Sequence, residues 1–204
     1  MTGSPFAHTI DEYLHVLSSS KPTPGGGSTS AVVAALGAAI ALMAARISDR
    51  NEDQVDIQQR VQRLKQHRDE FEKLCQEDME SFQRVMNALE RKKDEEQLQQ
   101  VIALAAAVPL RLAKECCSAM VLCEELIDRI QKNVLSDLGC AVFYLNAACQ
   151  GALLTMNINT RYLKDHEQSY RLQQEGQAVR KESNAKCNEI LFRIEEEMST
   201  ISGH

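Results

Sequence analysis

Three consecutive glycines followed by a run of small residues constrain this chain more than any other feature. The segment Thr23-Pro24-Gly25-Gly26-Gly27-Ser28 precedes an Ala-rich apolar run, Ala31 to Ala45. Glycine lets a ligand approach the bare backbone, and Ser28 is a favourable N-cap. The free N–H groups of a helix start attract an anion or a carbonyl oxygen. We therefore predict a binding site at a helix start that comprises Pro24, Gly25, Gly26, Gly27 and Ser28; a glycine hinge before a core helix is the alternative.

Two stretches are apolar on every side when drawn as helices. They are Ala31–Ala45 and Leu138–Leu154. A helix that is apolar all round is buried all round. The sequence is also rich in Ala, Leu, Glu and Gln, which favour helix, and contains no alternating strand pattern. We predict an all-α fold, a multi-helix bundle with two buried small-residue helices.

A third helix is long and amphipathic, from about Glu52 to Arg91. Its apolar seam advances by four and three residues in alternation, through Ile57, Val61, Leu64, Arg68, Phe71, Cys75, Asp78, Phe82, Val85 and Leu89. A carboxylate on such a seam is costly unless it is paired, hydrogen-bonded or used. Asp78 is therefore a point where the seam frays or widens, part of a structural ion pair, or a functional group, and the pattern leaves all three open.

Further polar residues flank the second apolar helix. Asn133, Ser136 and Asp137 precede it, and Asn157 and Asn159 are predicted just past its end. Each fits a cap or turn when taken alone. Taken together, they suggest that two buried helices bring their capped ends into one core region. Asp94 is predicted to cap another helix, which Pro109 should kink or divide.

Length and composition exclude several classes of function. Residues 1–204 are predicted to form a single domain, with 166–204 a polar C-terminal helix. The net charge of −6 argues against nucleic-acid binding, and the spacing of the five histidines argues against a metal site. The first apolar run is shorter than the roughly 20 residues of a membrane span. Seven cysteines without a Cys-x-x-Cys pair, and an N-terminus without a signal pattern, predict a cytoplasmic protein.

Five blocks in order resemble the cyclodeaminase/cyclohydrolase family of folate enzymes, and the resemblance extends from about Phe6 to Lys164. The blocks are Pro24-Gly25-Gly26-Gly27-Ser28 with its Ala-rich helix, Glu77-Asp78 with Phe82 and Val85-Met86, Val108-Pro109-Leu110, Asn133-Val134-Leu135-Ser136-Asp137, and Gly151-Ala152 through Asn157-Ile158-Asn159 to Lys164-Asp165. The order and spacing are more specific than any one block.

The resemblance implies an all-helical homodimer that binds folate in a cleft. The chemistry it implies is hydrolysis of 5,10-methenyltetrahydrofolate or cyclodeamination of formimidoyltetrahydrofolate, with no cofactor beyond the tetrahydrofolate substrate. Asp78 is the first candidate for the catalytic carboxyl and Asp137 the second. The glycine loop, Asn133, Ser136, Asn157, Asn159 and Lys164 are candidates for substrate binding.

Two segments depart from the family pattern. Ser48-Asp49-Arg50-Asn51 stands in place of a Gly-Lys-Lys-Tyr-like segment, and Ile130-Gln131 replaces a Gly-Asn pair. These departures favour an alternative of a different class, a non-catalytic helical dimer that retains folate binding. Turnover of methenyltetrahydrofolate separates the two hypotheses.

Overall fold

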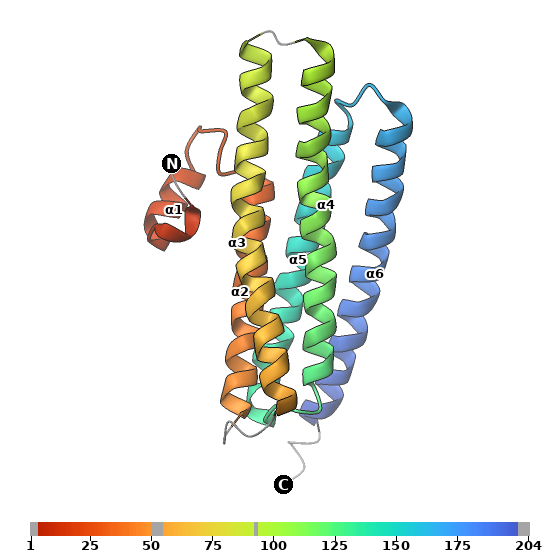
Figure 1. Cartoon of the computed structure of the whole chain (residues 1–204). Helices are drawn as coiled ribbons and strands as arrows, with labels where there is room; N and C mark the ends of the chain where they lie inside the picture. The colour runs from red at the N-terminus through yellow and green to blue at the C-terminus, as the bar shows by residue number, and fades with distance from the viewer. Residues whose placement is uncertain (1–3, 50–54, 92–93, 200–204) are drawn as a thin grey trace.

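The structure, a computed structural model, describes residues 4–49, 55–91 and 94–199. Within these ranges every regular element is helical: α1 (Ile10–Leu17), α2 (Gly26–Ser48), α3 (Val55–Glu90), α4 (Glu95–Leu126), α5 (Leu135–Thr160) and α6 (His166–Ser199), with short 3-10 turns at Pro5–Ala7 and Lys132–Val134. Five long helices run side by side as a bundle, and α1 stands apart from it (Figure 1). The all-α prediction is confirmed.

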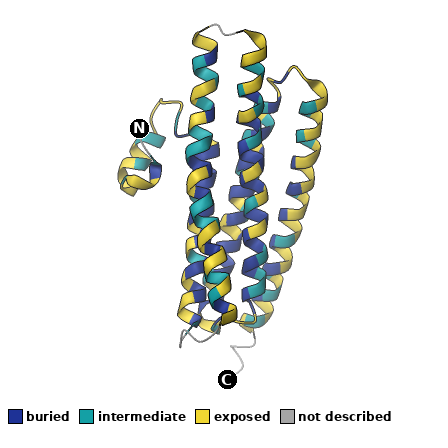
Figure 2. Ribbon diagram, in the orientation of Figure 1, coloured by how far each residue is buried: buried dark blue, intermediate teal, exposed yellow. Residues whose placement is uncertain are grey.

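The helices form two layers with α6 along one edge. α5 packs against α2, α4 and α6, and α3 packs against α2 and α4. Buried residues concentrate where the layers meet (Figure 2). The core joins the Ala-rich side of α2 to large side chains such as Leu64, Phe71, Leu122 and Leu145.

α2 and α5 are antiparallel and closely packed. A methyl group added at Gly151 would lie 2.4 Å from Ser30 Oγ, and one added at Gly37 would lie 3.0 Å from Leu145 Cγ. Near the start of α2, a methyl group at Gly26 would lie 3.6 Å from Thr155 Oγ1. Small residues let the two backbones approach, and the start of α2 therefore lies beside the last turns of α5.

The prediction that both small-residue helices are buried on every side is wrong. Leu36 and Met43 of α2 and Phe143 and Leu154 of α5 are exposed. The remaining sides of both helices face the other elements of the bundle. An all-apolar pattern indicates that every side of a helix avoids water. Within one subunit, other helices cover only part of α2 and of α5.

Pro109 does not divide its helix. α4 continues through Pro109 without interruption. Proline lacks the N–H that would bond the carbonyl four residues earlier. Here that carbonyl, of Ala105, accepts a hydrogen bond from Nδ2 of Asn159 at 2.7 Å. The side-chain amide of Asn159 replaces the missing donor, which explains how α4 accommodates Pro109.

Local capping follows the sequence in two places. Thr9 and Glu12 form a capping box at the start of α1, and Asp94 accepts the N–H of Gln97 at the start of α4. The predicted break after the second apolar run is wrong, because α5 extends to Thr160 and includes Asn157 and Asn159. α5 also begins at Leu135, one residue before the predicted Ser136.

Two helical segments are long and apolar enough to cross a membrane by length and composition. They are Gly26–Ser48 and Lys132–Thr160, with 56% and 50% of the apolar window buried inside the protein. About half of each segment is thus committed to the protein core.

Candidate active site at the start of helix α2

The candidate site is built on the first turn of α2. Gly25 is the N-cap, so the helix starts earlier than the predicted cap Ser28. Ser28 is instead the third helical residue, and its Oγ accepts the Gly25 N–H at 3.0 Å and donates to the Gly25 carbonyl at 3.2 Å. Ser28 is fully buried, and Pro24 is buried beside it after a cis Thr23–Pro24 bond.

The anion held by this helix start is the carboxylate of Asp78. The backbone N–H of Ser28 donates a hydrogen bond to Asp78. A Cβ added at Gly27 would lie 2.3 Å from Asp78 Oδ1 and 2.6 Å from its Cγ. Gly27 therefore leaves the space that the carboxyl group occupies. The helix start is a receptor for an anion, as the glycine pattern predicts, but its occupant comes from the same chain.

The environment of Asp78 shifts its proton affinity. Burial raises the pKa of this carboxyl to about 6, and the hydrogen bond from Ser28 opposes the shift. Desolvation disfavours the charged form, whereas a donated N–H favours it. The outcome is a carboxyl group that changes protonation state close to neutral pH, the range in which a general acid or base is most effective.

Cys75 lies one turn before Asp78 and was not singled out as a site residue by the sequence. Its Sγ donates to the Ser28 carbonyl at 3.3 Å. Burial and the neighbouring Asp78 charge raise the pKa of the thiol to about 12. Cys75 therefore remains a neutral donor that supports the loop, and thiolate chemistry at neutral pH is excluded.

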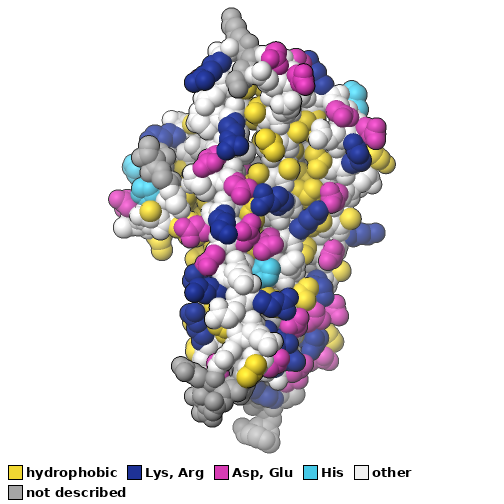
Figure 3. All heavy atoms as spheres, viewed as in Figure 1, with side chains coloured by type: hydrophobic (Ala, Val, Ile, Leu, Met, Phe, Trp, Pro, Cys, Tyr) yellow, Lys and Arg dark blue, Asp and Glu magenta, His cyan; other side chains and the backbone are white. Residues whose placement is uncertain are grey.

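The seam of α3 opens next to Asp78. Phe71, Leu74 and Cys75 are buried, whereas Phe82 and Val85 are only partly buried and Leu89 is exposed. α2 begins opposite Asp78, so the last turns of α3 extend past the helix that covers the rest of the seam. Hydrophobic side chains are visible between α3 and α4 on the upper part of this face (Figure 3). Asp78 thus lies where the side chains of the α3 seam change from buried to partly buried.

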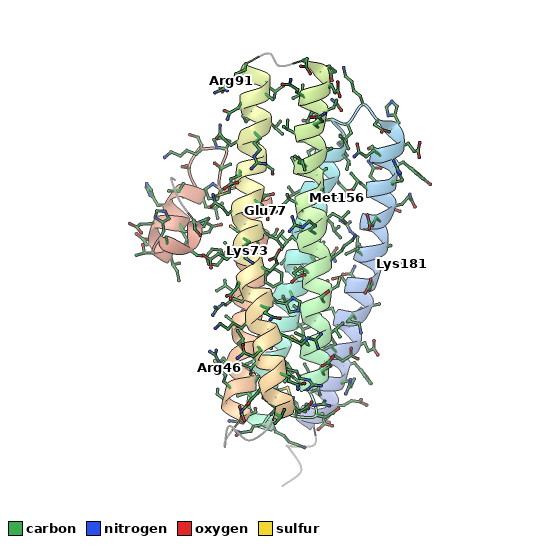
Figure 4. The ribbon with its side chains drawn as sticks, viewed as in Figure 1. Arg46, Lys73, Glu77, Arg91, Met156 and Lys181 are labelled. Atoms are coloured by element: carbon green, nitrogen blue, oxygen red, sulfur yellow. The ribbon has the colours of Figure 1, made fainter. Side chains whose placement is uncertain are left out.

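Charged residues edge this region. Arg111 of α4 donates to Glu77 at 2.7 Å, and Glu77 projects toward α4 in Figure 4. Lys164 lies at the same end, where its Nζ pairs with Glu95 at 2.9 Å. Both pairs are exposed, so they contribute little to stability. Arg111 therefore lies beside the residue that precedes Asp78, whereas Lys164 lies at the start of α4.

The structure separates the other predicted residues from Asp78. Asn133, Ser136 and Asp137 lie at the start of α5, which is beside the end of α2, because the Gln131 N–H donates to Ser48 Oγ at 2.8 Å. The 23 residues of α2 span about 35 Å. In Figure 4, Arg46 marks the end of α2 that lies near the start of α5, and Glu77, the neighbour of Asp78, lies farther up the bundle on α3. The prediction that both capped helix starts share one core region is wrong within this chain.

The two asparagines of α5 lie at the correct end but differ in role. Asn159 is committed to the Ala105 carbonyl. Asn157 follows Leu153 by one turn, and Leu153 contacts Gly176 of α6. Helical periodicity therefore directs Asn157 toward α6. Thr155, which the sequence did not indicate, is the α5 residue closest to Gly26 among the described contacts.

Among the described residues, no group of three or more His, Cys, Asp or Glu side chains is arranged to hold a metal ion. The cysteines in that part of the chain are free thiols, most of them buried. The arrangement offers a carboxyl group, that of Asp78, whose pKa of about 6 lies close to neutral pH and which accepts a backbone N–H at the start of α2.

Comparison with known proteins adds to this geometry. A sequence model of formiminotransferase-cyclodeaminase matches residues 9–178. The chain belongs to this family. It is 31% identical over 169 residues to a methenyltetrahydrofolate cyclohydrolase of Methylorubrum extorquens, covering 77% of this chain and 81% of that protein.

The fold of this chain is also similar to that of a solved structure. The crystal structure of formiminotetrahydrofolate cyclodeaminase from Thermotoga maritima matches with a TM-score of 0.81 and 26% identity, over 95% of this chain and 97% of that one. The family assignment inferred from the five sequence blocks is confirmed. Of the two departures from the family pattern, Ile130–Gln131 lies within the described fold, whereas Arg50 and Asn51 of the other lie outside the described residues.

Proposed function

We propose that this chain is an enzyme of tetrahydrofolate one-carbon metabolism that hydrolyses 5,10-methenyltetrahydrofolate to 10-formyltetrahydrofolate. The observation that carries the proposal is Asp78, a carboxyl group with a pKa of about 6 held against Gly27 and the Ser28 N–H. The similar cyclohydrolase and the family membership support the substrate class. A non-catalytic role is disfavoured, because a merely structural seam would gain stability from an apolar residue in place of Asp78.

The chemistry follows from the charge of the substrate. The methenyl bridge between N5 and N10 is an amidinium cation, and a carboxylate next to it stabilises it. Asp78 in its ionised form accepts a proton from the water that attacks the bridge carbon. The hydroxyl group of the adduct then loses its proton as the C=O bond forms, the bond from that carbon to N5 breaks, and N5 takes a proton, so that the 10-formyl compound results and one proton is released overall. Asp78 is the general base of this reaction.

The surroundings of Asp78 support this role. The Ser28 N–H orients the carboxylate, and Cys75 and Ser28 hold the loop by hydrogen bonds. The partly buried Phe82 and Val85, close to Asp78 on α3, suit the aromatic part of a folate, and Lys164 suits a carboxylate at its far end. We propose that the reaction needs no metal or second cofactor, that the enzyme is cytoplasmic, and that it acts as a homodimer.

Cyclodeamination of formimidoyltetrahydrofolate is the second candidate, and the similar Thermotoga maritima structure favours it. In that reaction N10 attacks the formimino carbon and ammonia leaves with a proton supplied by an acid. The same Asp78 would then act in its protonated form. The two reactions therefore require opposite protonation states of one group.

The test uses the purified chain with each substrate over a range of pH. Loss of the near-ultraviolet absorbance of methenyltetrahydrofolate reports hydrolysis, and ammonia release reports cyclodeamination. For hydrolysis, kcat/KM should rise as pH increases through about 6, because the base must be ionised. For cyclodeamination it should fall over the same interval. Absence of both activities would refute the proposal.

A further inference from the structure

Side chains from two other helices contact the first turn of α2 beside Asp78. Sγ of Cys75, on α3, donates to the Ser28 carbonyl at 3.3 Å. The hydroxyl of Tyr13, on α1, shares a hydrogen bond of 3.0 Å with Oγ1 of Thr29. These contacts fall on two consecutive residues of α2, and the first of them, Ser28, supplies the N–H that binds Asp78.

Both backbone polar groups of Ser28 are bound by α3. Its N–H donates to Asp78, and its carbonyl accepts from Cys75, which precedes Asp78 by about one helical turn. Ser28 and Cys75 are both fully buried, so water does not replace the thiol as a donor. The placement of the Ser28 N–H on the carboxylate therefore depends on the contact that Cys75 makes with the same residue.

The thiol of Cys75 stays a donor over the pH range in which Asp78 titrates. Burial and the neighbouring charges of Asp78 and Glu72 raise the pKa of the thiol to about 12. Its proton therefore remains on sulfur while Asp78, with a pKa of about 6, changes its protonation state. The hydrogen bond to Ser28 is thus present in both states of the carboxyl group.

Helix α1 is linked to the same turn through Tyr13. None of the eight residues of α1 is buried, and a groove of about 710 Å³ lies between α1 and the bundle (α1 stands to one side in Figure 1). Tyr13 is half-buried, and burial raises the pKa of its hydroxyl, so this group stays protonated at neutral pH. Because α1 packs loosely, its hydrogen bond with Thr29 contributes to the alignment of the two helices.

Hydrogen bonds within α2 fix the shape of this turn but not its position. Ser28 Oγ bonds both the N–H and the carbonyl of Gly25. Ser30 Oγ donates to the Gly26 carbonyl at 2.7 Å. These local bonds would persist if the turn moved as a unit relative to α3. Polar contacts from α3 and α1 therefore help to determine where the turn lies.

We propose that Cys75 and Tyr13 are positioning residues of the active site. They hold Ser28 and Thr29 so that the Ser28 N–H stays on the Asp78 carboxylate. The inference rests on the proposed role of Asp78 as the general base. Neither residue touches the reacting atoms, and each acts through the first turn of α2. Displacement of this turn weakens the bond that favours the charged carboxylate, so the base is misplaced and its pKa rises above about 6.

The charges around Asp78 leave this hydrogen bond as a sensitive determinant of its pKa. The titratable and charged side chains on the surrounding elements are Tyr13 of α1, Arg46 of α2, Glu72, Cys75 and Glu77 of α3, Arg111 of α4 and Asp137 of α5. Arg46 and Asp137 lie at the opposite end of the bundle, and Arg111 is engaged by Glu77. The pKa of Asp78 follows from burial and the Ser28 N–H.

The first measurement follows the carboxyl carbon of Asp78 by NMR in the full chain as pH changes, with Asp78→Asn identifying its signal. Tyr13→Phe and Cys75→Ala should each move the titration midpoint above that of the parent. Cys75→Ser keeps a donor and should lie closer to the parent than Cys75→Ala. The matched controls are Cys123→Ala, at a fully buried cysteine of α4, and Tyr170→Phe on α6, and both should leave the midpoint unchanged.

The direction of the shift separates positioning from packing. A cavity at Cys75 that merely admits water would favour the charged carboxylate and lower the midpoint. Tyr13→Phe removes only a hydroxyl group, so it tests the proposal without a loss of packing. A lowered midpoint in Cys75→Ala together with an unchanged one in Tyr13→Phe would overturn the proposal.

The second measurement is turnover of methenyltetrahydrofolate. Tyr13→Phe and Cys75→Ala should each lower kcat by about 5-fold or more with little change in KM, because they misplace the base rather than the substrate. Thr29→Val removes the partner of the Tyr13 hydroxyl at nearly constant volume. The double variant Tyr13→Phe and Thr29→Val should lose no more than one substitution alone, and additive losses would refute the link.

The two measurements distinguish failure of this proposal from failure of the proposed function. Unchanged midpoints in both Tyr13→Phe and Cys75→Ala would overturn the positioning roles even in an active enzyme. Raised midpoints in a chain without turnover would support the positioning of Asp78 by these residues and refute the proposed reaction. If Cys75→Ala does not fold, Tyr13→Phe and Thr29→Val give the decision, because both nearly preserve side-chain volume.

Discussion

The contact between Gly27 and Asp78 gives the sharpest test of the site. In Gly27→Ala the added methyl carbon would lie 2.3 Å from Asp78 Oδ1. Ordinary van der Waals contact needs about 3.4 Å, so the carboxylate must move by about 1 Å. This movement breaks the hydrogen bond from the Ser28 N–H and places the base out of line with its water. A misplacement of about 1 Å can cost about 100-fold in rate.

Gly26→Ala is the matched control. Its methyl carbon would lie 3.6 Å from Thr155 Oγ1, an ordinary contact, and Gly26 is exposed. Both substitutions exchange the same residue types in the first turn of α2. The obstructing atoms at Gly27 belong to a side chain that can rotate, so the cost in stability should be no more than about 1–3 kcal/mol.

The assay is turnover of methenyltetrahydrofolate together with a thermal melt. We expect Gly27→Ala to lose about 100-fold in kcat/KM while remaining folded, and Gly26→Ala to retain the parental rate within a few-fold. Equal activities of the two variants would refute the argument that the space at Gly27 positions Asp78. If Gly27→Ala melts at a lower temperature than the parent, the two activities are compared well below that melting temperature, where both proteins are folded.

Three further predictions concern Asp78, Asn159 and Asp137. Because the folded-state pKa of Asp78, about 6, exceeds the ordinary 3.8, its ionisation opposes folding above pH 6, and this cost fades as pH falls toward 4. The shift in pKa from 3.8 to about 6 corresponds to about 3 kcal/mol of unfolding free energy, and partial exposure of the carboxyl group reduces this to about 1–2 kcal/mol. Urea unfolding should therefore find Asp78→Asn more stable than the parent by that amount at pH 8 and equally stable at pH 4. Equal stability at both pH values would contradict the burial argument. Asn159→Ala should lower the free energy of unfolding by about 1–3 kcal/mol, because it leaves the Ala105 carbonyl without a hydrogen bond. Adding Pro109→Ala to this variant restores a backbone N–H and should recover most of the loss. An unchanged melting curve for Asn159→Ala would disprove the link between Asn159 and Pro109. Asp137→Asn should leave kcat within about threefold of the parent, because Asp137 lies at the far end of the bundle from Asp78. Loss of a general base lowers the rate by about 100-fold or more, so a decrease of that size would show that Asp137 belongs to the active site.

Much of the fold could be predicted because helix periodicity is a local property. The 4-3 spacing from Ile57 to Leu89 identified α3, and its interruption at Asp78 pointed to the site. The glycine run identified a helix start that holds an anion. What the local pattern did not contain was the direction of packing. Because α2 and α5 are antiparallel, Asp137 lies at the opposite end from Gly27.

Other features depend on contacts between distant segments. Asn159 and Ala105 are 54 residues apart, so no local rule links this amide to the gap left by Pro109. The distinction between Gly26 and Gly27 likewise requires knowing which of them faces α3. Exposure of Leu36 and Phe143 depends on which sides of α2 and α5 the other helices cover. The sequence indicated Gly26, Gly27 and Asn159 as candidate site residues, and packing determines what each of them does.

Turnover of 5,10-methenyltetrahydrofolate by the Asp78→Asn variant tests the catalytic role of Asp78 most directly. Asparagine keeps the shape of the side chain and can still accept the Ser28 N–H, but it neither takes nor gives a proton. We predict a correctly folded protein that binds a folate analogue within a modest factor of the parent and has lost about 100- to 10,000-fold in kcat. Turnover at the parental rate, after subtraction of the uncatalysed reaction, would contradict the assignment of Asp78 as the catalytic carboxyl group.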